Sequence, residues 1–149
     1  MHENDITYLI RQSAYNVHTA LGPGLLESAY EAALMYELQR VGLTVKSQVG
    51  LPMSYGEARL DVGYRIDLLV EGKVIVELKA LENILEVHHM QLVTYLNLSG
   101  CRAGLLINFN VARIRDGIFR KVNGMTETLP PRPSANTSAS SAVKTSPTP

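Results

Sequence analysis

The chain of 149 residues has little of several features on which particular protein classes depend. Its single cysteine, Cys101, cannot form an internal disulfide or a thiolate metal site, and we expect it to be a small buried hydrophobic residue. No apolar run approaches the roughly 18 residues that a membrane-spanning helix needs. The first ten residues carry acids where a secretion signal would carry bases and an apolar core. These absences predict a soluble, cytoplasmic protein without a membrane partner.

An excess of charge of either sign is also absent, because 14 basic residues balance 14 acidic ones. A protein that holds nucleic acid mainly by bulk electrostatics would be strongly basic, so any binding of nucleic acid must be local. The apolar fraction of 46% is ordinary for a globular protein. A chain of this length buries roughly two-thirds of the surface that its unfolded form exposes, so it can hold a core of its own.

The composition shifts once, at Pro130. Residues 130–149 are almost all Pro, Ser, Thr and Ala, and such a segment cannot offset its ordering entropy by burying apolar side chains. We therefore predict one folded domain over residues 1–129, followed by a disordered tail over residues 130–149.

The folded part predicts an α/β protein. Apolar residues at steps of three and four indicate helices, and short apolar runs bounded by turn residues indicate strands. Turns are expected at Gly56-Glu57 and at Glu71-Gly72. The predicted elements are helices over 6–21 and 26–41, strands over 43–55, 59–70 and 73–81, a helix over 85–99, a strand over 102–111 and a short edge strand over 114–122.

The hairpin around Glu71-Gly72 carries unusual charges. A two-residue loop would mix apolar and charged residues on both faces of the hairpin. A loop of three residues, with Gly72 or its neighbour at positive φ, pairs Val70 with Val74 and keeps the faces distinct. That register sets Asp67 opposite Glu77, with their Cβ atoms about 5 Å apart.

Two carboxylates this close repel each other, and burying them without a positive partner is costly. Lys79 is one candidate partner. A hard divalent cation such as Mg²⁺ or Mn²⁺ is the other, because the cluster offers oxygen ligands and no His or Cys. The alternative is a cross-strand salt bridge among Asp67, Arg65, Glu77 and Lys79 on a solvated face of the sheet.

Two helices place further polar residues where they can meet this hairpin. The stripe on the helix over 85–99 consists of His88, Gln91 and Tyr95. On the helix over 26–41, Glu27, Tyr30 and Glu31 are near neighbours, and Gly24 just before them allows close approach of the backbone. Each residue also has an ordinary interpretation: the tyrosines as half-buried packing, Gln91 as a solvated residue and Glu27 as a first-turn acid.

The pattern of Asp67, then Glu77-Leu78-Lys79, then Gln91 resembles the PD-(D/E)XK nuclease superfamily. The segment Gly24-Leu25-Leu26-Glu27-Ser28-Ala29-Tyr30 is similar to the motif of its GxxExxY branch. The resemblance implies a restriction-endonuclease-like core of helix, three-stranded meander, helix and strand, here with an extra N-terminal helix. Ile66 stands where the superfamily has its signature proline.

The resemblance also implies a metal site. Asp67 and Glu77 would hold Mg²⁺ or Mn²⁺, with the backbone carbonyl of Leu78 completing the shell and Glu27 contributing directly or through water. Its reaction would be metal-dependent hydrolysis of a phosphodiester bond in nucleic acid, with DNA favoured over RNA. A homodimer is compatible with this assignment.

Catalytic roles follow from the same resemblance. Lys79 would orient and help to deprotonate a water molecule near the metal and stabilise charge on the phosphate. Gln91 would hold Lys79 or the phosphate, and Glu27 and Tyr95 would support the site, with His88 close by.

A second interpretation is a non-catalytic module that binds nucleic acid or a protein through the same fold. This interpretation is favoured by the small number of clustered basic residues, because the sequence contains one modest basic cluster. That cluster consists of Arg113, Arg115, Arg120 and Lys121. It is suited either to follow a nucleic-acid backbone or to form a solvated edge.

Overall fold

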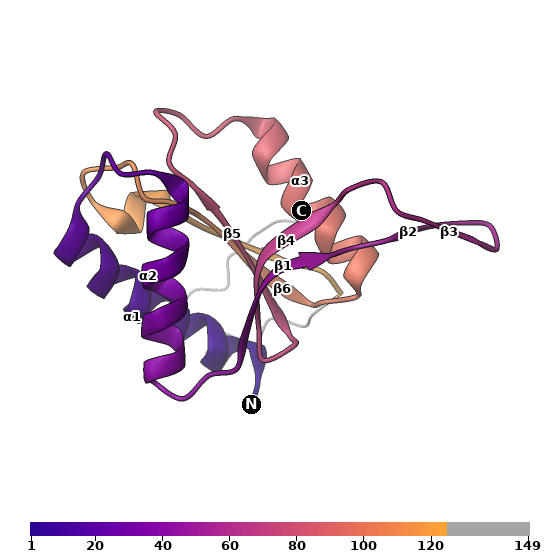
Figure 1. The fold of residues 1–149 in the computed structure, drawn as a ribbon, viewed down its shortest axis with the longest axis horizontal. Helices are drawn as coiled ribbons and strands as arrows, with labels where there is room; N and C mark the ends of the chain where they lie inside the picture. Colours follow the sequence, from indigo (N-terminus) through magenta and orange to yellow (C-terminus); the bar gives the residue numbers. More distant parts are fainter. Residues whose placement is uncertain (125–149) are drawn as a thin grey trace, which may run out of the picture.

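The computed structural model describes residues 1–124, and its elements follow the predicted order (Figure 1). The elements are α1 (Glu3–Leu21), α2 (Glu27–Arg40), β1 (Val45–Gly50), β2 (Met53–Tyr55), β3 (Ala58–Leu60), β4 (Arg65–Val70), β5 (Val74–Lys79), α3 (Glu86–Ser99), β6 (Ala103–Asn108), a 3-10 turn η1 (Ile114–Gly117) and β7 (Ile118–Val122). The predicted domain boundary at residue 129 and the predicted tail lie outside the described residues.

Five strands form one mixed sheet in the order β1-β4-β5-β6-β7. Strands β5 and β6 run parallel, because α3 carries the chain back between them, and the other neighbours are antiparallel. Helices α1 and α2 cover one face of the sheet and α3 covers the other (Figure 1). This arrangement confirms the predicted α/β class, a restriction-endonuclease-like core with an extra N-terminal helix and with β7 as the predicted edge strand.

Each face of the sheet has its own apolar core. The apolar stripe of α1, with Ile6, Ile10 and Ala14 fully buried, packs with α2 against one face. On the other face α3 packs so closely on β6 that a Cβ added at Gly104 would lie 2.9 Å from Leu92 Cδ1. Cys101 is half-buried at this second core, rather than fully buried as expected. Both faces of the central strands are therefore shielded from water.

The strands predicted over 43–55 and 59–70 are each interrupted, which corrects the sequence-based prediction. Strands β2 and β3 form a separate two-stranded sheet that projects from the body as an arm (Figure 1). Pro52, which has no N–H to donate, precedes β2, and Gly63 at φ 85° follows β3. The turn at Gly56, with φ 61°, forms as predicted. The two breaks separate the arm from the main sheet.

Within residues 1–124, no helix combines the length and the apolar character that crossing a membrane would demand.

Candidate active site

The β4–β5 hairpin adopts the predicted register. Val70 pairs with Val74 across a three-residue connection. Glu71 at φ 56° and Gly72 at φ 64° both take the left-handed conformation, and the N–H of Lys73 donates to the Val70 carbonyl at 3.0 Å. The prediction of a three-residue loop with positive φ is therefore confirmed.

The regular pairing of β4 with β5 ends at Leu68 and Val76. Beyond this pair, side-chain carboxylates accept the backbone N–H groups in place of the carbonyls of the neighbouring strand. Glu77 Oε2 accepts a hydrogen bond from the Asp67 N–H, and Asp67 Oδ2 accepts one from the Leu78 N–H, both at 2.9 Å. We call this opening, formed by Asp67, Glu77 and Leu78, the β4–β5 fork. Both carboxylates reach into the same gap, as the register predicts.

Burial dominates the electrostatics of the fork. Glu77 is 4% exposed, and this burial, followed by the negative charge of Asp67, raises the pKa of Glu77 to about 8. Burial also raises the pKa of Asp67, against the opposing effects of the Leu78 N–H and of Lys79. The folded protein thus favours a proton or a cation at this pair of carboxylates.

The alternative of a solvated cross-strand salt bridge is wrong. The face that carries Glu77 is buried, and Arg65 donates instead to the Gln48 carbonyl at 3.1 Å. Neither ion pair found within residues 1–124 involves the fork. Those two pairs are Arg40–Glu37 and Arg102–Glu3.

Lys79 and Glu27 approach the fork from different elements. Lys79 ends β5 and is half-buried, and its charge acts to lower the pKa values of Asp67, Glu77 and Glu27. Glu27 is the first residue of α2 and is exposed as a residue, but partial burial of its carboxyl group and then the charge of Asp67 raise its pKa. The structure therefore brings these four charged residues into one electrostatic neighbourhood.

The acids do not, however, form a ready-made three-carboxylate metal site. Across the described part of the chain, no group of three or more His, Cys, Asp or Glu side chains is arranged to hold a metal ion. Glu27 interacts electrostatically with Asp67 and Glu77 but does not complete a three-carboxylate group with them. The donor set still suits a hard divalent cation, because it consists of oxygens and because the buried carboxylates have raised pKa values without an ion pair.

Tyr30 explains how Glu27 is held at the start of α2. The Tyr30 ring is fully buried and stacks on Phe109, with ring centres 4.5 Å apart and planes 6° apart. Its hydroxyl donates to the Gly22 carbonyl at 2.6 Å, which ties the loop before α2 to the core. Gly24 in this loop has φ 99° and open space around it. Glycine is therefore needed here for the positive φ, and not for the close approach of another backbone segment that we expected.

Helix α3 contributes Tyr95 and Gln91 to the fork. Tyr95 is buried, and burial followed by the charge of Glu77 raises its pKa. The Gln91 amide Nε2–H donates to the Tyr95 hydroxyl at 3.1 Å, so Gln91 is hydrogen-bonded to Tyr95 rather than to Lys79. His88 Nδ1 instead accepts the N–H of Leu85 at 2.9 Å and caps the start of the helix.

Sequence reasoning missed Gln48. It lies in β1 between the pairs Ser47–Leu68 and Val49–Ile66, which sets it opposite Asp67. Its φ of 53° is unusual for a residue other than glycine, and its amide donates to both carboxylate oxygens of Glu31, at 3.1 and 3.2 Å. A hydrogen bond from Gln48 also acts to lower the pKa of Asp67. Only the register of β1 against β4 could have revealed this residue.

Asn108 was also missed, because it ends an apolar strand without any motif. It is 3% exposed, and its amide group exchanges two hydrogen bonds with the backbone of Leu81, at 3.0 and 2.9 Å. The N–H of Phe109 donates to the Lys79 carbonyl at 3.0 Å. These bonds fix the backbone at the Lys79 carbonyl and two residues after it.

The basic residues predicted as one cluster lie in two places. Arg115 in η1 and the preceding Arg113 line a depression beside His18 near the end of α1. Arg120 in β7 instead bonds to Asn4, near the start of that helix. Asn4 and His18 are about 20 Å apart along the helix axis. Lys121, next to Arg120, is half-buried, so no continuous basic stripe forms from these four residues.

Comparison with known proteins supports the resemblance at the level of the superfamily. The sequence profile described as the PD-(D/E)XK nuclease superfamily matches residues 4–121, which covers all helices and nearly all strands of the structure. No curated protein and no solved structure shows a significant match to the chain. Proteins of this superfamily act on nucleic acids and generally use divalent metal ions. On the extent of this match, the chain belongs to the PD-(D/E)XK nuclease superfamily.

Proposed function

We propose that this protein is a metal-dependent nuclease of the GxxExxY branch, which hydrolyses phosphodiester bonds at the β4–β5 fork. The observation that carries the proposal is the pair of carboxylates formed by buried Glu77 and half-buried Asp67, which face each other across an interrupted ladder with Lys79 beside them. A buried acid pair of this kind reduces stability, and its retention is explained by function.

The residues of the fork suit a divalent cation. Asp67, Glu77 and the Leu78 carbonyl would hold it, and Glu27 would act through a water molecule, because it does not complete a three-carboxylate group with the pair. When bound, the cation supplies Lewis-acid activation of the phosphate and of a water molecule. Mg²⁺ is the proposed ion, with Mn²⁺ as its substitute.

The remaining roles belong to side chains of this chain. Lys79 orients the attacking water and stabilises negative charge that develops on the phosphate. Tyr95 interacts electrostatically with both carboxylates, and Gln91 donates to its hydroxyl, so we assign this pair the role of positioning groups at the fork. We further propose that DNA is preferred over RNA, that the protein works in the cytoplasm and that it is able to act as a homodimer.

A non-catalytic module that binds nucleic acid or protein is the second candidate. The observation that favours it is the separation of Arg113 and Arg115 from Arg120, which leaves no continuous basic stripe among these residues. In that case the β4–β5 fork would have no catalytic role.

Cleavage assays distinguish the two candidates. The full chain is incubated with single-stranded, duplex and branched DNA and with RNA, in Mg²⁺, Mn²⁺ or EDTA. Lys79→Ala and Asp67→Asn are expected to lose cleavage, while Lys46→Ala, an exposed lysine of β1, keeps it. A folded wild-type protein that cleaves none of these substrates would favour the binding module.

A further inference from the structure

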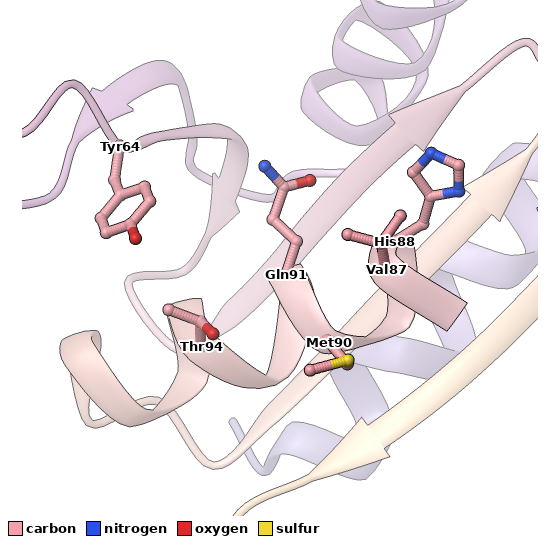
Figure 2. Close-up of a pocket in the computed structure, with 6 residues that line it drawn as sticks. All are labelled: Tyr64, Val87, His88, Met90, Gln91 and Thr94. Carbon is pink, nitrogen blue, oxygen red and sulfur yellow. The ribbon is translucent and has the colours of Figure 1, made fainter. Parts of the chain in front are cut away.

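An open depression lies between α3 and the segment that enters β4 (Figure 2). It has a volume of about 410 Å³, within the range of pockets that bind small molecules, about 300–1,000 Å³. The lining residues are Tyr64, Val87, His88, Met90, Gln91 and Thr94. In Figure 2, Tyr64 lies across the depression from the α3 residues Gln91 and Thr94.

The chemistry of the lining indicates the kind of ligand. Among residues 1–124, no Lys, Arg, Asp or Glu lines the depression, and the Nδ1 atom of His88 already accepts the Leu85 N–H, so the lining does not suit a phosphate or a metal ion. It combines an aromatic ring with the side chains of Val87 and Met90, which are 60% and 59% exposed. Gln91 and Thr94 add hydrogen-bonding groups. A flat ligand with apolar faces and a polar edge matches this set, and a nucleobase has this form.

The depression shares a wall with the β4–β5 fork. Gln91 lines the depression and donates to the hydroxyl of Tyr95, whose ring packs in the same apolar core as Ile66, the residue before Asp67. The Tyr64 ring packs edge-on against Tyr95, with ring centres 5.7 Å apart. A base held here would therefore belong to a nucleotide close to the phosphate at the fork.

We propose that this depression binds an unstacked nucleobase of the substrate, so that the preferred substrate is single-stranded or locally unpaired nucleic acid. The inference rests on the proposed function, because it places the base beside the nuclease site. A base inside a duplex is stacked on both faces, and it enters such a depression only after it is unstacked at a cost of a few kcal/mol.

The test measures binding of the full chain in EDTA by fluorescence anisotropy, so that cleavage plays no part. The probes are a single-stranded DNA, an RNA of the same sequence, the matching duplex, and a single strand in which every base is replaced by an abasic spacer. The abasic strand keeps the phosphates and loses only the bases. We expect the wild-type protein to bind the single strands more tightly than the duplex, and the abasic strand about tenfold more weakly.

Tyr64 variants identify the site of the effect. Tyr64→Ala and Tyr64→Leu are expected to weaken binding of the normal single strand about tenfold and to leave binding of the abasic strand unchanged. Tyr64→Leu keeps an apolar group against Tyr95, which guards against a loss of folding. Tyr64→Phe should bind as the wild type does. Tyr36→Ala, an exposed tyrosine of α2 at 64% exposure, is the matched control and should have no effect.

Two results would overturn the proposal: equal weakening of the normal and abasic strands by the Tyr64 variants, or binding of the duplex as tight as that of the single strand. Failure of the proposed function is separate. If the base-dependent effect of Tyr64 is found but Mg²⁺ and Mn²⁺ support no cleavage, the depression binds a base in a protein that is not a nuclease. If cleavage occurs without that effect, the nuclease stands and the base site is refuted.

Discussion

The two ends of the β4–β5 hairpin contrast sharply. At the closed end Val70 and Val74 pair in a regular ladder, and both are fully buried. At the open end the ladder stops, and the carboxylates of Asp67 and Glu77 accept the backbone N–H groups that the neighbouring strand no longer serves. One register thus aligns apolar residues at one end and acids at the other.

The difference shows that one end of a hairpin can stabilise the fold while the other end carries the reactive groups. Buried apolar pairs stabilise the sheet at any pH, whereas buried carboxylates depend on protonation or on a bound cation. The open end is expected to determine activity, and the closed end is expected to determine the free energy of unfolding. Four experiments test this contrast, from the largest effect to the smallest.

The largest effect is expected from Asp67→Asn. We expect the rate of nucleic-acid cleavage to fall by about 10³-fold, because a group that binds and orients the reacting centre loses its charge. The asparagine keeps an oxygen that can accept the Leu78 N–H and removes the repulsion with Glu77, so the urea midpoint should not fall. Cleavage at the wild-type rate would show that the fork is not the catalytic centre.

The apolar ladder that begins at the closed end is tested at its last regular pair by Leu68→Ala. Leu68 is fully buried and pairs with Val76, so its truncation is expected to lower the free energy of unfolding by about 2–5 kcal/mol. Urea unfolding measures this loss. The cleavage rate per folded molecule should remain near that of the wild type, and a parallel loss of activity would contradict the division between the two ends.

The pH dependence of the free energy of unfolding also distinguishes the two ends, because the carboxylates with raised pKa values lie at the open end. With EDTA present, folded Glu77 keeps its proton up to a pKa of about 8, whereas the unfolded chain releases it near 4.5. The folded state therefore holds more protons in this window, and the free energy of unfolding should fall as the pH rises from 4.5 to 8.

Glu77→Gln should reduce this dependence and exceed the wild type in stability at pH 8 by on the order of 4 kcal/mol, and the smaller dependence that remains belongs to the other acids with raised pKa values, such as Asp67. Urea unfolding at a series of pH values gives the slope for both proteins. Leu68→Ala serves as the control, because it should keep the wild-type slope. Equal slopes for wild type and Glu77→Gln would show that Glu77 does not titrate in this range.

The smallest effect concerns the backbone of Gln48. At φ 53° a glycine is unstrained, whereas alanine retains the strain, so Gln48→Gly should be more stable than Gln48→Ala by about 1 kcal/mol. Both variants lose the amide bonds to Glu31 and should reduce cleavage by a similar factor. Thermal unfolding and cleavage assays measure the two quantities, and an alanine variant of equal or greater stability would show that the backbone has relaxed.

Much of this architecture is readable from local patterns. The step of three and four in α1, the alternation in β4 and the short apolar run of β5 lead directly to the elements, because each of these patterns is typical of one backbone geometry. The register of Val70 with Val74 follows from the requirement that like faces match. Asp67 and Glu77 are therefore brought together by information that a short stretch of sequence contains.

Other features depend on distant residues. The arm of β2 and β3 leaves the sheet although its residues alternate like those of a long strand, and Pro52 and Gly63 mark the breaks without revealing where the arm goes. The basic residues of 113–121 separate because the two ends of α1 engage different ones. No local pattern records such contacts.

The sequence by itself determined the order of the elements and the pairing that faces the two acids toward each other. Only the tertiary structure decided that Glu77 is buried, that Gln48 and Tyr95 approach the fork, and that Glu27 interacts with the fork without completing a three-carboxylate group. The physical reason is that pairing across a short turn follows from neighbouring residues. Burial and electrostatic environment arise only when α2 and α3 close over both faces of the sheet.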